Sequence, residues 1–277
     1  MMDTTLGSTT TRRTVMFEYD FMQNAFAASG IAAVMAGLAG YFLVLRGQSF
    51  AGHALSHIGF TGATGAVLIG APPLWGLIMA TVAGGIGMGL LGERFAQRDV
   101  AIGIVLTVSL GLGLLFLHFF TSSATAATAL LFGNVLAVDA ATVWVLLALG
   151  VITVAVLALL SRPLLFASIQ PELAEAKGVP LQGVGVAFLA IVALATAGAV
   201  QIVGVLLVFA LMVGPGAAAQ RLTSGIVPGL GLATGLALAE AWLGLALAYA
   251  TDWPTSFWIT VLSAGVYLAA TIRDRIT

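Results

Sequence analysis

Apolar residues run along this chain in blocks about as long as a membrane is thick, and charged residues mark the ends of the blocks. The run from Ala25 to Leu45 carries no charge, and no Asp, Glu, Lys or Arg occurs between Arg46 and Glu93. Unbroken apolar runs of this length satisfy their backbone polar groups in lipid only as helices, because the strands of membrane barrels alternate and are shorter. The pattern therefore predicts an all-α bundle that crosses a membrane several times.

Nine apolar segments can be separated by their charges, prolines and threonine-rich interruptions. They are residues 25–45, 58–71, 74–91, 100–120, 142–160, 182–200, 203–219, 226–249 and 257–272. A loop is expected at Thr121–Thr128, and the polar residues 1–24 are expected to form a flexible tail before a single transmembrane domain at 25–277. The apolar run after Arg12 and Arg13 is too long for the core of a cleaved signal peptide, so it is expected to remain as a helix.

The composition supports the membrane assignment and excludes several other classes of protein. Of the 277 residues, 60% are hydrophobic and 8% are charged, and the mean hydropathy is +1.11. A soluble domain carries about 25% charged residues, so this chain has too few to cover a surface that faces water. The net charge of −1 gives no electrostatic basis for binding nucleic acid, and the absence of cysteine excludes disulfides and thiolate metal sites.

The number of spanning helices and the side of the N-terminus have two interpretations. If all nine segments span, the basic residues outside the tail share one side, while Asp139 and Asp252 lie opposite. Because Lys and Arg favour cytoplasmic loops, residues 161–180 and the C-terminus then face the cytoplasm. Alternatively the short segment 58–71 is re-entrant, eight helices span, and the N-terminus lies inside. The sequence leaves both interpretations open.

His53 and His57 form the first candidate site. They are four residues apart, so a helix presents both imidazoles on one face, which is a spacing that binds a divalent metal. The pair lies in a stretch without formal charges, where polar side chains are costly and usually functional. The alternative is that both histidines bond to backbone carbonyls; we favour the metal site. The pair is not a zinc peptidase motif, because position 54 is Ala and not the required Glu.

Residues 161–180 form the second candidate site. The sequence PELAEAK begins at Pro171 and is followed by Gly178. It predicts a short helix that starts at the proline and stops at the glycine. A short polar helix between two spans is suited to dock another protein, although a solvated loop explains the composition equally well. No G-x-x-x-x-G-K-[ST] motif occurs, so the chain has no recognisable ATP site of its own.

Two acidic residues are candidates for a polar pathway. Glu240 lies inside an apolar span, where it would line a path, carry a proton or serve as a structural partner; the structural role is slightly favoured. Asp252 is expected in a loop on the side where a cation would enter, together with Asp139.

These residues give the chain a resemblance to the membrane permeases of ABC importers for zinc, manganese and related divalent metals. The block from Tyr41 to Arg46 and on to the sequence FAGHALSH at Phe50–His57 resembles the most recognisable part of that family. Further ordered similarities occur at Phe21–Ala25, Ala101–Val105, Leu131–Asn134, Pro171–Gly178, Val203–Pro215 and Asp252–Pro254. Together they cover the chain from Phe21 to its C-terminus.

The resemblance implies a function and a set of partners. It predicts a permease in the bacterial inner membrane, a homodimer, with an extracytoplasmic metal-binding protein on one side. ATPase subunits would dock in the cytoplasm on the coupling residues Pro171, Glu172, Ala174, Glu175 and Gly178. ATP hydrolysis would then belong to another subunit, and this chain would be no enzyme and hold no permanent cofactor.

The resemblance also assigns the transported metal, with one departure. The family's usual block reads G-D-A-L-S-H, whereas this chain has His53 at the position of the aspartate and keeps His57. Two imidazoles suit zinc better than manganese, because oxygen ligands favour the harder ion. We therefore expect Zn²⁺ as the cargo, with Mn²⁺ as the alternative. A secondary, proton-coupled transporter that uses Glu240, or a membrane metalloenzyme, are the rival functions.

Overall fold

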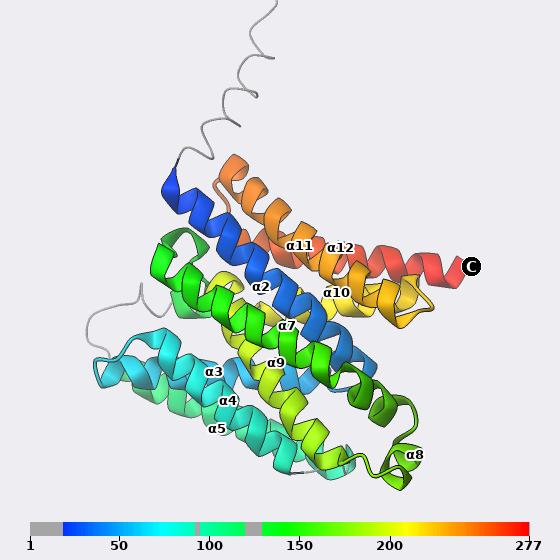
Figure 1. Cartoon of the computed structure of the whole chain (residues 1–277). Coiled ribbons are helices and arrows are strands. Elements are labelled where there is room, and N and C mark those ends of the chain that lie inside the picture. The colour runs from blue at the N-terminus through cyan, green and yellow to red at the C-terminus, as the bar shows by residue number, and fades with distance from the viewer. Residues whose placement is uncertain (1–18, 92–94, 120–128, 277) are drawn as a thin grey trace, which may run out of the picture.

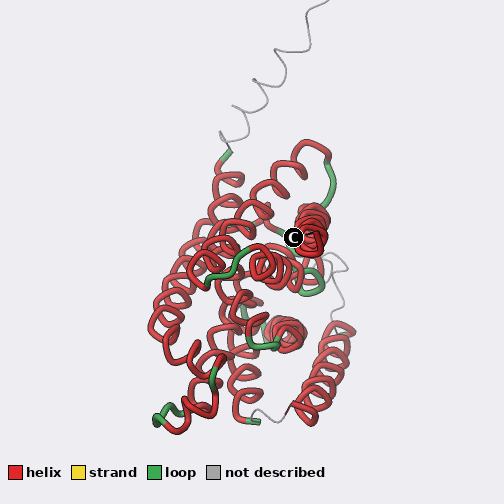
Figure 2. The backbone as a smooth tube through the Cα atoms, turned by 90° about the vertical axis from the view of Figure 1, so that its right-hand side faces the viewer, coloured by secondary structure: helices red, strands yellow, loops and turns green. Residues whose placement is uncertain are grey.

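The structure is a computed structural model that describes residues 19–91, 95–119 and 129–276, and every element in these ranges is a helix (Figures 1 and 2). The long helices are α2 (Asp20–Leu45), α3 (Ser49–Leu68), α4 (Pro73–Leu90), α5 (Phe95–His118), α7 (Ala140–Ile169), α9 (Leu181–Val203), α10 (Val208–Leu222), α11 (Ile226–Thr251) and α12 (Thr255–Ile276). Two short elements, η1 (Val135–Ala137) and α8 (Pro171–Ala176), lie between them. The all-helical prediction is confirmed.

Each of the nine apolar segments corresponds to one long helix, although several boundaries differ. The first helix begins at Asp20, five residues before the predicted start, and α3 begins at Ser49 and so includes both histidines. The rest of the expected tail, residues 1–18, and the expected loop at Thr121–Thr128 lie outside the described residues.

Six of the described helices are long and apolar enough to cross a membrane by length and composition: α2, α4, α7, α9, α11 and α12. The apolar part of α5 is shorter, Ile102–His118, and α3 and α10 do not meet the same criteria. The predicted count of eight or nine spans is therefore approximate.

The helices alternate in direction, so their ends gather at two opposite ends of the bundle (Figure 1). At one end, a cleft is lined by Gln48 before α3, Leu90 of α4, Glu175 of α8 and Gln182 of α9. At the other end, Pro72 between α3 and α4 shares a cleft with the start of α7 and the end of α9. Helix α3 thus runs from one end to the other.

Charge separates the two ends. The end that carries α8, here called the basic end, holds Arg46, Arg162, Lys177, Arg221, Arg273 and Arg275 at or near the helix termini. The opposite end, here called the acidic end, holds Asp20, Asp139 and Asp252 and no Lys or Arg among the described residues. This asymmetry is the one that the sequence predicts for a multi-pass membrane protein.

Helices α2 and α9 form the centre of the bundle, and small residues let their neighbours approach closely. Gly40 of α2 is the clearest case, because a Cβ atom at this position would overlap the backbone carbonyl of Met212 in α10. Gly216 of α10 in turn lies against the backbone of Gly40. Helices in lipid gain little from hydrophobic burial, so close packing of this kind is a main source of their association.

Helix α7 is longer than predicted. The predicted segment ended at Leu160, but the helix continues through Pro163 to Ile169. The proline removes one backbone hydrogen bond, to the carbonyl of Leu159, and such losses are tolerated in membrane helices whose neighbours support the backbone. The first nine residues of the predicted segment 161–180 are therefore helical, and only its second half contains the separate helix α8.

Helix α10 is shorter than predicted and starts after a turn at Gly204–Leu207. Gly204 has a φ of +81° and Gly133 has a φ of +78°, values that favour glycine, and a Cβ on either residue would overlap backbone atoms of the other's segment. Beside them, the amides of Val205 and Leu206 donate to the carbonyls of Leu130 and Leu131, each at 3.2 Å. Backbone hydrogen bonds thus join the α9–α10 turn to residues 130–133 at the acidic end.

Candidate metal site

Helix α3 brings His53 and His57 together as the sequence predicted. The ring centroids are 4.8 Å apart and the rings are nearly perpendicular, at 85°. With a rise of 1.5 Å per residue, the two histidines lie roughly 6 and 12 Å from the first residue of the helix at the basic end. The pair is therefore inside the bundle, nearer to the basic end than to the acidic end.

Both imidazoles keep a nitrogen without a partner. His57 is 6% exposed and His53 is partly exposed, and the Nδ1 atoms of both are buried without a hydrogen bond. Buried polar atoms are nearly always hydrogen-bonded, so two such nitrogens on adjacent rings need an explanation. A neutral imidazole nitrogen is the usual protein ligand of a transition metal, and the arrangement offers two.

The chain supplies this site with few other ligands. Among the residues that the structure describes, no three His, Asp or Glu side chains gather in one place. A metal held by His53 and His57 would therefore complete its shell with ligands other than the acidic and histidine side chains of the described residues. An incomplete shell is suitable for transport, because a conducted ion must also leave its site.

Two aromatic rings flank His53 that the sequence analysis did not identify. Phe50 lies 6.2 Å from the His53 ring and Phe209 of α10 lies 5.7 Å from it, measured between centroids. Both phenylalanines are exposed on the surface of the single chain. Phe50 could have been found, because it lies three residues before His53 on the same helix face. The sequence has no signal for Phe209, which tertiary packing alone brings to this position.

Glu240 occupies a different environment from the histidine pair. It lies in α11, is 1% exposed, and its two carboxyl oxygens make no hydrogen bond. The hydroxyl of Ser263 in α12 lies beside the carboxyl. The structure thus confirms that this carboxyl is enclosed within the helices and does not lie in a loop.

Asp252 lies at the acidic end, where α11 stops. Its backbone is left-handed, with a φ of 58°, and its side chain is exposed. The residue borders a cavity of about 530 Å³ that Asn134, Tyr249 and Ser256 also line. Asp139 lies at the same end, and hydrogen bonding from the Thr142 side chain, and then from the Thr142 amide at 2.9 Å, lowers the pKa of its carboxyl.

The predicted short helix exists as α8 and is closed by Gly178, as the sequence indicated. Gly178 has a φ of +82°, and the amides of Gly178 and Val179 donate to the carbonyls of Glu175 and Ala174. Pro171, Glu172, Glu175 and Gly178 are exposed, whereas Ala174 is fully buried. Four of the five predicted coupling residues therefore face outwards, and the fifth anchors α8 to the bundle. Glu175 also borders the basic-end cleft, of about 880 Å³, beside Gln48.

Comparisons with known proteins support the resemblance found in the sequence. The family model described as the ABC 3 transport family matches residues 18–274. The manganese transport system membrane protein MntC of Halalkalibacterium halodurans is 30% identical over 92% of this chain and 88% of its own length. The manganese import system permease protein ScaB of Streptococcus gordonii is 28% identical over 92% of both chains.

A solved structure shares the fold. It is described as PsaBC from Streptococcus pneumoniae in complex with Fab, and its matched chain is 25% identical, with a TM-score of 0.83 over 92% of both chains. The family, the relatives and the apolar helices together define a multi-pass protein of the bacterial plasma membrane that transports and is not an enzyme. This chain belongs to the ABC 3 transport family and is the membrane permease of a metal-importing ABC transporter.

Proposed function

We propose that this permease carries Mn²⁺ into the cell and that His53 and His57 bind the ion on its way. The names of the relatives, which refer to manganese transport, support the metal. They do not support zinc, which the sequence analysis preferred. The observation that supports the site is the pair of adjacent, nearly perpendicular imidazoles, whose Nδ1 atoms are both buried and without a hydrogen bond.

Zinc import is the second candidate function, and one observation favours it. The two protein ligands at the proposed site are both nitrogen atoms, which suit Zn²⁺ better than Mn²⁺. Any additional ligands would come from water or from a second copy of the chain, and oxygen ligands would shift the preference back towards Mn²⁺. Which of the two ions the site prefers therefore depends on its complete set of ligands.

We propose that the acidic end faces outwards and the basic end faces the cytoplasm, following the preference of Lys and Arg for cytoplasmic loops. An extracytoplasmic metal-binding protein would deliver the ion at the end where Asp252 lies beside its cavity. ATPase subunits would dock at the other end on α8, through the exposed Pro171, Glu172 and Glu175.

A homodimer would complete the pathway. His53 is partly exposed, and the exposed Phe50 and Phe209 surround it on the surface of one chain. A second copy related by a two-fold axis would cover this surface and place its own histidine pair opposite. The pathway would then run between two copies, with up to four imidazoles available to the ion.

Competitive uptake tests the proposed metal. The complete complex is reconstituted in vesicles with ATP, and ⁵⁴Mn²⁺ and ⁶⁵Zn²⁺ uptake are measured separately and in competition. A complex whose ATPase cannot hydrolyse ATP is the control. We expect ATP-dependent Mn²⁺ uptake that excess Zn²⁺ inhibits; preferential uptake of Zn²⁺ would instead establish the second candidate.

The same vesicles address the proton-coupled rival, in which Glu240 carries a proton. The isolated permease is given a proton gradient without ATPase subunits or ATP. We expect no metal uptake. Uptake driven by the gradient would overturn the proposal that this chain acts within an ATP-driven complex.

A further inference from the structure

Glu240 and Ser263 place two enclosed polar side chains where α10, α11 and α12 meet. They are 1% and 2% exposed. The Ser263 hydroxyl lies beside the Glu240 carboxyl and donates a hydrogen bond to the backbone carbonyl of Ala210 in α10, at 2.8 Å. Polar groups are costly at this depth in a membrane protein, and those that persist usually contribute to function.

The hydrogen bond from Ser263 is made to α10, a helix that lacks one of its own backbone hydrogen bonds. Helix α10 has 15 residues and contains Pro215, which cannot donate to the carbonyl of Leu211. Gly214 faces Ser263 so closely that a Cβ at this position would overlap the serine hydroxyl. The contact between Ser263 and α10 therefore fixes the distance between α10 and α12. It also fixes the register of α10 along α12.

The residue next to Ala210 reaches the proposed metal site. Phe209 presents its ring to His53 at 5.7 Å between centroids, with the planes at 80°. A displacement of α10 that broke the bond to Ala210 would also move Phe209 relative to His53. The enclosed pair and the histidine pair are thus connected through two consecutive residues of one helix.

We propose that Glu240 and Ser263 are positioning residues for metal transport: they hold α10 in the register that places Phe209 against His53. Ser263 acts through the carbonyl of Ala210, and the Glu240 carboxyl, which has no hydrogen bond of its own, is the enclosed polar group beside the serine. This role rests on the proposed function of His53 and His57, and it needs no proton or metal to pass through Glu240.

The first experiment replaces Ser263 with Ala in the complete complex and measures Mn²⁺ uptake over a range of metal concentrations. We expect KM for the metal to rise by roughly threefold or more while uptake at saturating metal changes less, because the site is disturbed and not removed. Gly265→Ala is the matched control, since a Cβ there meets open space two residues away on the same helix. An unchanged KM, or the same change in the control, would overturn the role.

Two substitutions of Glu240 separate positioning from proton transfer. Glu240→Gln keeps a polar group of the same size beside Ser263, whereas Glu240→Leu removes it. We expect the Gln variant to resemble the unmodified permease and the Leu variant to raise KM as Ser263→Ala does. If Gln and Leu abolish uptake equally, the carboxyl itself is required, and the positioning role is refuted.

A double-mutant cycle tests the route through Phe209. If Ser263 acts by placing this ring, Ser263→Ala should add little to the effect of Phe209→Leu, whereas independent sites would add. Mn²⁺ binding to the purified full-length chain, followed by electron paramagnetic resonance, is measured in parallel for His53→Ala/His57→Ala. If that pair of changes leaves binding intact, the proposed metal site fails. If it abolishes binding while the cycle is additive, only the positioning role fails.

Discussion

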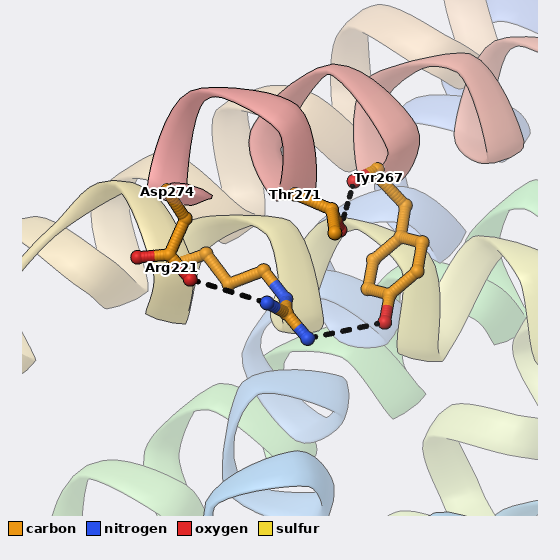
Figure 3. A network of polar contacts seen from close by, with 4 residues as sticks. All are labelled: Arg221, Tyr267, Thr271 and Asp274. Carbon is orange, nitrogen blue, oxygen red and sulfur yellow. Dashed lines mark hydrogen bonds and ion pairs between the residues drawn. The ribbon is translucent and has the colours of Figure 1, made fainter. Parts of the chain in front are cut away.

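The histidine pair on α3 and the arginine network at the basic end are two polar clusters of opposite kind. In the network, Arg221 of α10 pairs with Asp274 of α12 at 3.2 Å and donates to the Tyr267 hydroxyl at 3.4 Å (Figure 3). The backbone carbonyl of Tyr267 accepts a hydrogen bond from Thr271 in turn. In the pair, the rings of His53 and His57 lie edge to face, and each keeps a buried nitrogen without a hydrogen bond.

The difference between the two clusters indicates which polar groups in such a protein are expected to bind a ligand. The side chains of Arg221 and Asp274 are 37% and 47% exposed, so water and salt screen their attraction and the pair contributes little to stability. The Nδ1 atoms of the histidines are buried and have no partner among the described residues, and such burial is unfavourable unless something binds there. Function is therefore expected at the unsatisfied cluster and not at the satisfied one.

The largest expected effect comes from removing the interior pair. In His53→Ala/His57→Ala, metal uptake by the reconstituted complex should fall by more than about tenfold, because the proposed site loses both of its protein ligands. The complex with the ATPase should still form and can be checked by co-purification. Ser56→Ala is the matched control, since its hydroxyl bonds only to the His53 carbonyl of its own helix turn at 2.7 Å. Normal uptake by the double variant would remove the pair from the pathway.

A single change at the same pair should alter selectivity more than rate. His53→Asp replaces one nitrogen ligand with oxygen, so the ratio of Mn²⁺ to Zn²⁺ uptake should rise by roughly threefold to tenfold, equivalent to about 0.7 to 1.4 kcal/mol. The ratio is measured by competition in vesicles, with the unmodified complex as reference. A ratio that stays constant would show that position 53 does not contact the ion.

At the basic end, the expected effect is smaller and concerns coupling. Glu175→Arg reverses an exposed charge on α8, so the ATP hydrolysed per metal ion transported should rise by about twofold or more as docking weakens. Asp274→Arg reverses another exposed carboxylate at the same end and is the control. Equal behaviour of the two variants would show that α8 is an ordinary solvated segment.

The smallest effect is expected within the arginine network itself. Asp274→Asn removes the charge that faces Arg221, and the free energy of unfolding should change by less than about 1 kcal/mol. Thermal unfolding of the purified permease in detergent at low and high salt measures the change. A loss well above this value would mean that the network is more than an exposed ion pair, and the contrast with the histidine pair would weaken.

The sequence predicted the helices where composition alone decides them. The nine apolar runs each became a helix, and Pro171 and Gly178 located α8 because each residue has a strong local preference at a helix end. Several boundaries differed, and two of the differences involve more than the local pattern. Helix α7 continues through Pro163 despite the lost backbone hydrogen bond, and the backbone contact between Gly204 and Gly133 delays the start of α10.

The candidate site was predictable only in part. The four-residue spacing of His53 and His57 determines that their rings share a face, and this could be read from the sequence. Phe209 approaches His53 from a helix more than 150 positions along the chain, and Ser263 meets Glu240 from a different helix. Such contacts depend on how the helices pack, and no local pattern encodes them.

The junction between the α9–α10 turn and residues 130–133 has a consequence for how the permease moves and varies. It is built from backbone amides and carbonyls, and Gly133 and Gly204 cannot be exchanged there, because a Cβ on either residue would overlap backbone atoms. The junction fixes the first turn of α10 at the acidic end through backbone hydrogen bonds, whereas an exposed ion pair and a hydrogen bond hold the Arg221 end against α12. We therefore expect the opening and closing of the pathway to be larger at the basic end, where the ATPase subunits are proposed to dock.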